Sequence, residues 1–97
     1  MLFAVLFEDN ENCAADVRGR HMSEHLDFLS RHASMIRAAG PLHQNEDSGA
    51  GGLWLVEADT PEVVDRLVQT DPFWSTGLRR SVRVLVWKQV FADGTRL

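Results

Sequence analysis

Residues 53–74 read LWLVEADTPEVVDRLVQTDPFW, and they are the most informative segment of the chain. The segment opens with four apolar residues in succession, a pattern typical of a strand covered on both faces. Thr60-Pro61 then predicts a helix start, because a hydroxyl can cap the helix and proline suits its first turn. Asp71-Pro72 ends that helix, since a residue before proline avoids helical angles. The predicted buried face of the helix consists of Val63, Val64, Leu67 and Val68.

Toward the N-terminus, residues 1–7 are continuously apolar and predict a second buried strand. Residues 8–16 are polar and predict a loop, with Asp16 as a possible helix cap. An amphipathic helix follows, on spacings of four, three and four that join Met22, Leu26, Leu29 and Ala33. We end it near Ala33, because residues 35–39 before Gly40-Pro41 suit a short edge strand.

Two further segments complete the chain. Residues 43–52 contain three glycines among polar side chains and predict a solvent loop. Residues 81–91 place Val82, Val84, Val86 and Val90 at a period of two, which predicts one long last strand.

The resulting order, βαββαβ, is the ferredoxin-like split βαβ plan, an α+β fold. It predicts a single domain over residues 1–97, with a four-stranded antiparallel sheet and both helices on one face. Residues 1–7 and 53–56 are nevertheless apolar on both sides, so the other face also needs cover. A second copy of the same sheet is the simplest cover, which predicts a homodimer.

The composition limits the class of protein. Hydrophobic residues make up 44% and charged residues 25% of the chain, as in an ordinary soluble domain. A net charge of −4 with scattered basic residues argues against nucleic acid as a partner. No apolar run approaches the roughly 18 residues of a membrane helix, and residues 1–7 lack the features of a signal peptide. The single cysteine, Cys13, fits a reducing cytoplasm, which is the predicted location.

His25 and Asp71 are the candidate functional residues. His25 lies at the edge of the apolar stripe of its helix, where an imidazole can exchange protons near neutral pH. A boundary histidine bonded to backbone is the more common explanation of such a position, and the residues alone favour it. Asp71 is either a turn residue before proline or a carboxylate that holds the His25 ring in one tautomer. The spacing does not show that they meet, and Phe73 and Trp74 beside Asp71 are either core residues or an aromatic pocket wall.

Three other patterns carry weaker hypotheses. His21-Met22-Ser23-Glu24-His25 matches the H-x-x-E-H zinc string, but a third ligand and a peptide cleft are missing, so we expect no metal. Residues 48–52 lack the lysine and hydroxyl of a phosphate loop and predict a flexible turn. Cys13 stands in a polar loop without basic neighbours, which argues against a nucleophile.

Four segments in order resemble the YCII-related family of small ferredoxin-like proteins. They are His25-Leu26 with Leu29, residues 39–42, the glycines before Leu53, and Asp71-Pro72-Phe73 followed by Gly77. The resemblance runs from Met1 to about Phe91 and implies a dimeric α/β barrel. It also implies His25 and Asp71 as the active pair. An arginine often precedes the family's histidine, and Arg20 or Arg18 takes that place here.

From this resemblance we expect a small cytoplasmic enzyme of lyase or isomerase type, which includes dehydrochlorinase-like activity, with a small organic ligand such as a hydroxylated ring. His25 would act as general base or acid with Asp71 as its orienting partner, and Arg20, Phe73 and Trp74 would bind substrate. No cofactor is expected. Two alternatives stay open: a non-catalytic module that binds a small molecule, and an assembly protein whose dimer surface is its function.

Overall fold

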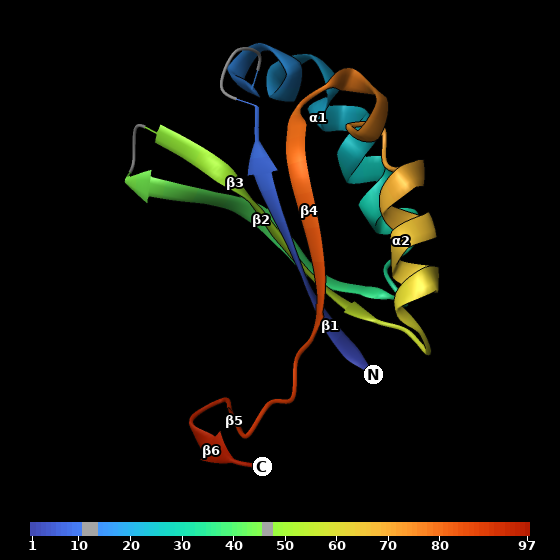
Figure 1. The fold of residues 1–97 in the computed structure, drawn as a ribbon, viewed down its shortest axis with the longest axis vertical. Coiled ribbons are helices and arrows are strands. Elements are labelled where there is room, and N and C mark those ends of the chain that lie inside the picture. Colours follow the sequence, from blue (N-terminus) through green and yellow to red (C-terminus); the bar gives the residue numbers. More distant parts are fainter. Residues whose placement is uncertain (11–13, 46–47) are drawn as a thin grey trace.

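The computed structural model describes residues 1–10, 14–45 and 48–97 (Figure 1). It confirms the predicted βαββαβ order and adds a short helical turn and a C-terminal hairpin. The elements are β1 (Leu2–Asp9), α1 (Ala14–Arg31), β2 (Ile36–Asn45), β3 (Ser48–Glu57), α2 (Pro61–Thr70), the 3-10 helix η1 (Trp74–Thr76), β4 (Arg79–Val86), β5 (Phe91–Ala92) and β6 (Thr95–Arg96).

The four long strands form one antiparallel sheet in the order β2-β3-β1-β4. Both helices lie on one side of it, with α1 and α2 on the right of the sheet in Figure 1. The fold is therefore α+β and ferredoxin-like, as predicted.

The main core fills the space between this sheet and the helices. Alternate residues of β1 point into it, and their partners on β3 share the same face, as pleating requires. Helix α2 contributes Val64, Leu67 and Val68, while the predicted Val63 is only partly buried. The buried residues of this core are Phe3, Val5, Phe7, Phe28, Ile36, Trp54, Val56, Val64, Leu67 and Val68.

The local signals at both ends of α2 act as the sequence predicted. The Thr60 side chain accepts a hydrogen bond from the backbone N–H of Val63, and Pro61 stands in the first turn. At the other end, the backbone N–H of Asp71 donates to the carbonyl of Val68, and Asp71 itself is extended. The end of the helix therefore fixes the position of Asp71.

The predicted solvent loop over residues 43–52 is wrong. Strand β2 continues through Asn45, and β3 begins at Ser48, so the glycine-rich stretch is paired strand. Gly51 is needed there because a Cβ atom would lie 1.8 Å from the backbone oxygen of Phe7 on β1. Glycine thus permits a close approach of two strands rather than a turn.

Other predicted boundaries also need correction. The polar segment 8–16 is predicted as a loop, but β1 runs to Asp9 and α1 begins at Ala14, which puts Asp16 in its first turn. Helix α1 ends at Arg31, and the edge strand predicted over residues 35–39 extends from Ile36 to Asn45. Cys13, the candidate nucleophile that the sequence argues against, lies outside the described residues.

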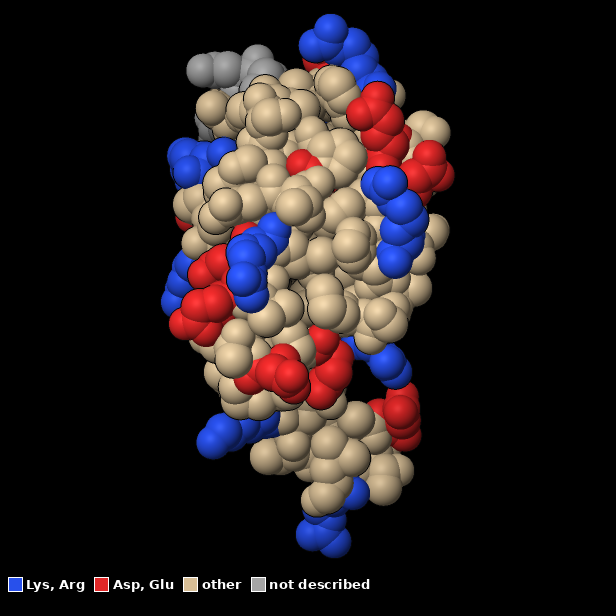
Figure 2. Space-filling model, turned by 90° about the vertical axis from the view of Figure 1, so that its right-hand side faces the viewer, with Lys and Arg blue, Asp and Glu red and all other residues tan. Residues whose placement is uncertain are grey.

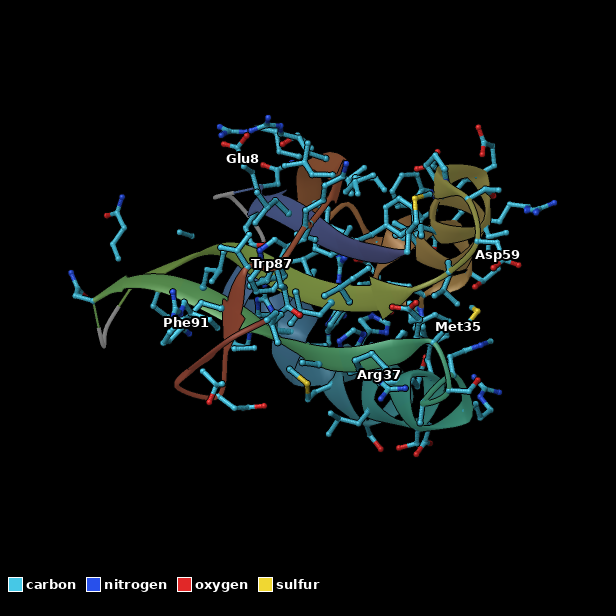
Figure 3. The ribbon with its side chains drawn as sticks, turned by 90° about the horizontal axis from the view of Figure 1, so that it is seen from below. Glu8, Met35, Arg37, Asp59, Trp87 and Phe91 are labelled. Carbon is cyan, nitrogen blue, oxygen red and sulfur yellow. The ribbon has the colours of Figure 1, made fainter. Side chains whose placement is uncertain are left out.

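The last strand is shorter than predicted. Strand β4 ends at Val86, and the backbone N–H of Trp87 makes the final contact, to the carbonyl of Leu2. Because β1 begins at Leu2, a strand continuing to Phe91 has no neighbour to pair with. The chain instead leaves the sheet and folds back as the β5–β6 hairpin, which projects on the side away from α2 (Figure 1). Figure 3 views the molecule from below, with Trp87 and Phe91 labelled on this segment.

The sheet face opposite the helices is apolar and partly exposed. Register places Ala4 beside Leu55 and Leu85, and Leu6 beside Leu53, on this face. The projecting segment is also apolar, with Val90 77% and Leu97 75% exposed. On the face shown in Figure 2, basic and acidic side chains are interspersed among uncharged ones, and neither sign covers the whole face. Within the described ranges, neither helix is long and apolar enough to cross a membrane.

Candidate active site

Asp71 is fixed by the turn that follows α2. Its side chain is fully buried, and its Oδ1 atom accepts a hydrogen bond of 3.3 Å from the backbone N–H of Phe73. The backbone N–H of Trp74 donates to the Asp71 carbonyl, which closes the same turn. The sequence Asp-Pro-Phe-Trp thus ends the helix and holds one carboxylate inside the protein.

His25 reaches that carboxylate from α1. Its Nδ1 atom lies 2.8 Å from Oδ1 of Asp71, and its side chain is only 10% exposed. The ring packs against Phe73, with centroids 4.4 Å apart. In the neutral tautomer that this contact favours, Nδ1–H donates to Asp71 and Nε2 is the nitrogen left for a ligand. The structure therefore brings together the two residues that the sequence singled out.

Arg79 is a third member that the sequence analysis missed. The left-handed Gly77 and the buried Leu78 lead the chain into β4, where Arg79 is the first residue. Its Nη2 atom lies 2.9 Å from Oδ2 of Asp71, and its side chain is 6% exposed. This contact is an ion pair, and Oδ2 of Asp71 has no hydrogen-bond partner among the described residues. An arginine at the start of a strand is ordinarily solvated, and no local pattern marks this one as buried.

The guanidinium of Arg79 is held by aromatic rings as well as by charge. Its Cζ atom lies 3.6 Å from the ring centroid of Phe7 and 5.3 Å from that of Trp54, a cation–π arrangement. Burial lowers the pKa of Arg79 to about 10, although the Asp71 carboxylate opposes this change. Arg79 therefore remains protonated at neutral pH.

A small hollow lies against these residues, between α1 and the β2–β3 side of the sheet. Its volume is about 100 Å³. That is below the roughly 150 Å³ of an apolar cavity known to hold benzene, so a single ring bound here would lie partly outside the hollow. Its lining is Phe7, Arg18, Met22, His25, Leu26, Leu29, Ala39, Gly40, Pro41, Gly52, Trp54 and Arg79.

Of the two arginines considered before His25, the structure places Arg18 and not Arg20 at the hollow. Arg18 is bound to both carboxylate oxygens of the buried Asp9, at 2.9 and 3.0 Å, and to the carbonyl of Gly51 at 3.2 Å. Arg20 is 68% exposed and pairs with Asp16 one turn away on the same helix. The helix turn of 100° per residue separates the two side chains.

Phe73 and Trp74 do not form the wall of the hollow. Phe73 is fully buried behind the His25 ring, where it supports the histidine, and Trp74 is 43% exposed on the surface. Phe7 and Trp54, whose rings meet edge to face at 5.0 Å, are the aromatic residues that line it.

The H-x-x-E-H string does not gather around a common point. His21 lies 3.9 Å from Glu24 and is about one-third exposed, whereas Nδ1 of His25 is turned to Asp71. In the parts of the chain that the structure describes, no three His, Cys, Asp or Glu side chains are grouped as a metal site would require.

Comparisons with known proteins agree with this fold. A family model, the YCII-related domain, matches residues 1–88. Comparison with curated protein sequences gives no match. Among solved structures, the chain is similar to 5-chloro-2-hydroxyhydroquinone dehydrochlorinase (TftG) from Burkholderia phenoliruptrix AC1100, in complex with 2,5-dihydroxybenzoquinone. The TM-score is 0.79 at 27% identity, covering 91% of this chain and 94% of that chain.

Proposed function

The chain belongs to the YCII-related domain family, and we propose that it is a small lyase or isomerase with His25 and Asp71 as its acid–base pair. The ligand is a small hydroxylated ring compound. The observation that carries this proposal is the 2.8 Å contact between the buried Asp71 and His25, which lines the hollow. The similarity to a dehydrochlorinase bound to dihydroxybenzoquinone supports the class of ligand.

In the proposed mechanism, Nε2 of His25 takes the proton of a ring hydroxyl. Asp71 accepts from Nδ1–H throughout, so it orients the imidazole and stabilises the imidazolium that forms. The electron pair left on oxygen passes into the ring. For an isomerase, the proton then returns to a ring carbon. For a lyase, the proton is instead returned to the ring carbon that carries chlorine, which makes that carbon saturated. A second ring hydroxyl then gives its proton to Nε2, and chloride leaves the saturated carbon with its bonding electrons, so the net loss is HCl.

The walls of the hollow suit a flat ligand. Phe7 and Trp54 supply aromatic surface, while Leu26 and Leu29 of α1 supply aliphatic surface. A peptide or a nucleotide is too large for a hollow of about 100 Å³. The proposal involves no cofactor, and it places the enzyme in the cytoplasm, as one cysteine in 97 residues favours.

The proposal includes a homodimer. The partly exposed apolar face around Leu6, Leu53 and Leu85 is the surface on which a second copy would lie. The C-terminal segment with the β5–β6 hairpin projects on the same side of the molecule (Figure 1), and its Phe91 and Leu97 are largely exposed.

The test is an anaerobic assay of the purified chain with 5-chloro-2-hydroxyhydroquinone and related halogenated hydroxylated rings. Release of free chloride, or a change in ring absorbance without chloride release, is expected for a lyase or an isomerase respectively. Activity must depend on His25 and not on His21, which lies one turn earlier on the same helix. Tight binding without any turnover across the series would instead favour the binding module.

A further inference from the structure

We infer that the hollow beside His25 selects ring compounds carrying a negative oxygen, and that Arg79 is the residue that binds this oxygen. The inference rests on the proposed function and adds two things to it: the charge of the ligand and the residue that recognises it. Family membership and the His25–Asp71 contact do not require either one.

The first observation is that Arg79 has N–H donors that find no acceptor among the described residues. Its Nε and Nη1 groups are buried and find no hydrogen-bond partner within the described residues. The counter-ion of Arg79 is Asp71, whose Oδ2 atom lies 2.9 Å from Nη2. Buried N–H groups of a charged side chain are costly when unpaired, so an acceptor arriving with a ligand would relieve that cost.

The second observation is how the guanidinium is presented. Stacking on Phe7 occupies one face of its plane, and aromatic faces do not accept the in-plane N–H groups well. The edge of the guanidinium is thus the part left to recognise an oxygen, and Arg79 borders the hollow that His25 also lines. Since both contact the same carboxylate, a ligand that touches both spans one short, fixed distance.

The third observation separates Arg79 from the other arginine at the hollow. Nη2 of Arg18 donates to both carboxylate oxygens of Asp9 and to the carbonyl of Gly51. The charge of Arg18 is therefore neutralised by Asp9. Arg79 is paired instead with Asp71, a carboxylate that also contacts His25. A ring anion, or a ring hydroxyl that has passed its proton to His25, would bring negative charge next to the guanidinium of Arg79, whose counter-ion is shared with His25.

The experiment is equilibrium binding of two probes that share one ring. The first is 2,5-dihydroxybenzoquinone, whose vinylogous acid groups are ionised at neutral pH, and the second is its dimethyl ether, which cannot ionise. All proteins carry Cys13→Ser, so that the quinone cannot add to the thiol. Wild-type binding is expected to favour the ionised probe by about ten- to a hundred-fold, the scale of a charged hydrogen bond.

Two variants and one control assign the preference. Arg79→Met is expected to abolish it, and Arg79→Lys to keep a reduced preference, because an ammonium supplies charge without the planar donors. Arg80→Met is the matched control, since Arg80 is the next residue, 60% exposed and paired with Glu8. If Arg79→Met does not fold, the wild type and Arg79→Lys decide.

The inference is overturned if the ionised probe does not bind, if both probes bind the wild type equally, or if the folded Arg79 variants discriminate as the wild type does. The readout is binding, so it separates this inference from the proposed function. Discrimination without turnover of any ring supports the inference and contradicts the function. Chloride release without discrimination does the reverse.

Discussion

His25 and Arg79 contact opposite oxygens of one buried carboxylate. Nδ1 of His25 lies 2.8 Å from Oδ1 of Asp71, and Nη2 of Arg79 lies 2.9 Å from Oδ2. The two residues come from α1 and β4, so Asp71 ties a helix to the first residue of a strand through charge. A change in any of the three is therefore expected to affect both stability and the hollow.

Replacing His25 by alanine is expected to lower turnover about 10²-fold or more while the protein stays folded, the usual loss for a positioned acid–base group. The measurement is turnover of the best ring substrate, with circular dichroism as a check on folding. His21→Ala is the matched control, because His21 lies on the same helix but does not line the hollow. Full activity of the His25 variant contradicts the proposed role.

Replacing Asp71 by asparagine is expected to destabilise the fold by about 3–5 kcal/mol, because it leaves the buried guanidinium of Arg79 without a counter-ion. Urea unfolding measures the loss. Asp16→Asn serves as the control, since its pair with Arg20 is largely exposed and such pairs contribute about 0–1 kcal/mol. Equal stability of both variants would mean that the Asp71–Arg79 pair is solvated in solution.

Replacing Gly51 by alanine is expected to destabilise the sheet severely, since the new Cβ would lie 1.8 Å from a backbone oxygen that cannot move freely. Gly19→Ala is expected to stabilise the protein instead. A Cβ at Gly19, inside α1, would enter open space, and alanine is favoured over glycine in a helix by about 1 kcal/mol. Thermal melts of both variants measure these changes in stability. A Gly51→Ala variant as stable as the wild type would refute the close approach of β1 and β3.

The order of helices and strands could be predicted from the sequence because each of these elements has a local cause. Thr60 and Pro61 start α2, Asp71-Pro72 ends it, and the apolar run of β1 needs cover. Sequence reasoning failed where a distant partner decides. Gly51 suggests a turn until Phe7 lies against it, and the alternation to Val90 suggests a strand until β1 runs out at Leu2.

The candidate site divides in the same way. The pairing of His25 with Asp71 was accessible only through the family resemblance, because the spacing of 46 residues does not place them together. Arg79 carries no local signal at all, since its burial depends on Phe7, Trp54 and Asp71 meeting around it. Arg18 and Arg20 both precede the histidine, and only the rotation of α1 distinguishes them.

Glu8 is expected to titrate with a pKa below its ordinary value of 4.5, because Ser81 and Arg80 both donate to its carboxylate. The folded-state pKa is lowered, so this carboxylate contributes stability above about pH 4.5 that is lost as the pH falls through the lowered value. Titration followed by NMR measures the pKa directly. Ser81→Ala removes the largest cause and is expected to raise the pKa of Glu8; an unchanged value would show that Ser81 does not donate in solution.

The final prediction concerns the open sheet face. Leu6→Asp adds a charge beside Leu53, on the side of β1 that faces away from the core, so the monomer is expected to fold normally. If a second copy covers this face, burying on the order of 2,000 Å² in total, the charge is desolvated at the interface and the dimer dissociates. Gln69→Asp adds the same charge on the exposed side of α2 and is expected to leave the dimer intact.

A chain ending at Lys88 removes Val90, Phe91 and Leu97, whose exposed side chains are expected to pack on the partner, so it too is expected to dimerise more weakly. Sedimentation velocity at micromolar concentration measures all four proteins, and a monomeric wild type would contradict the homodimer.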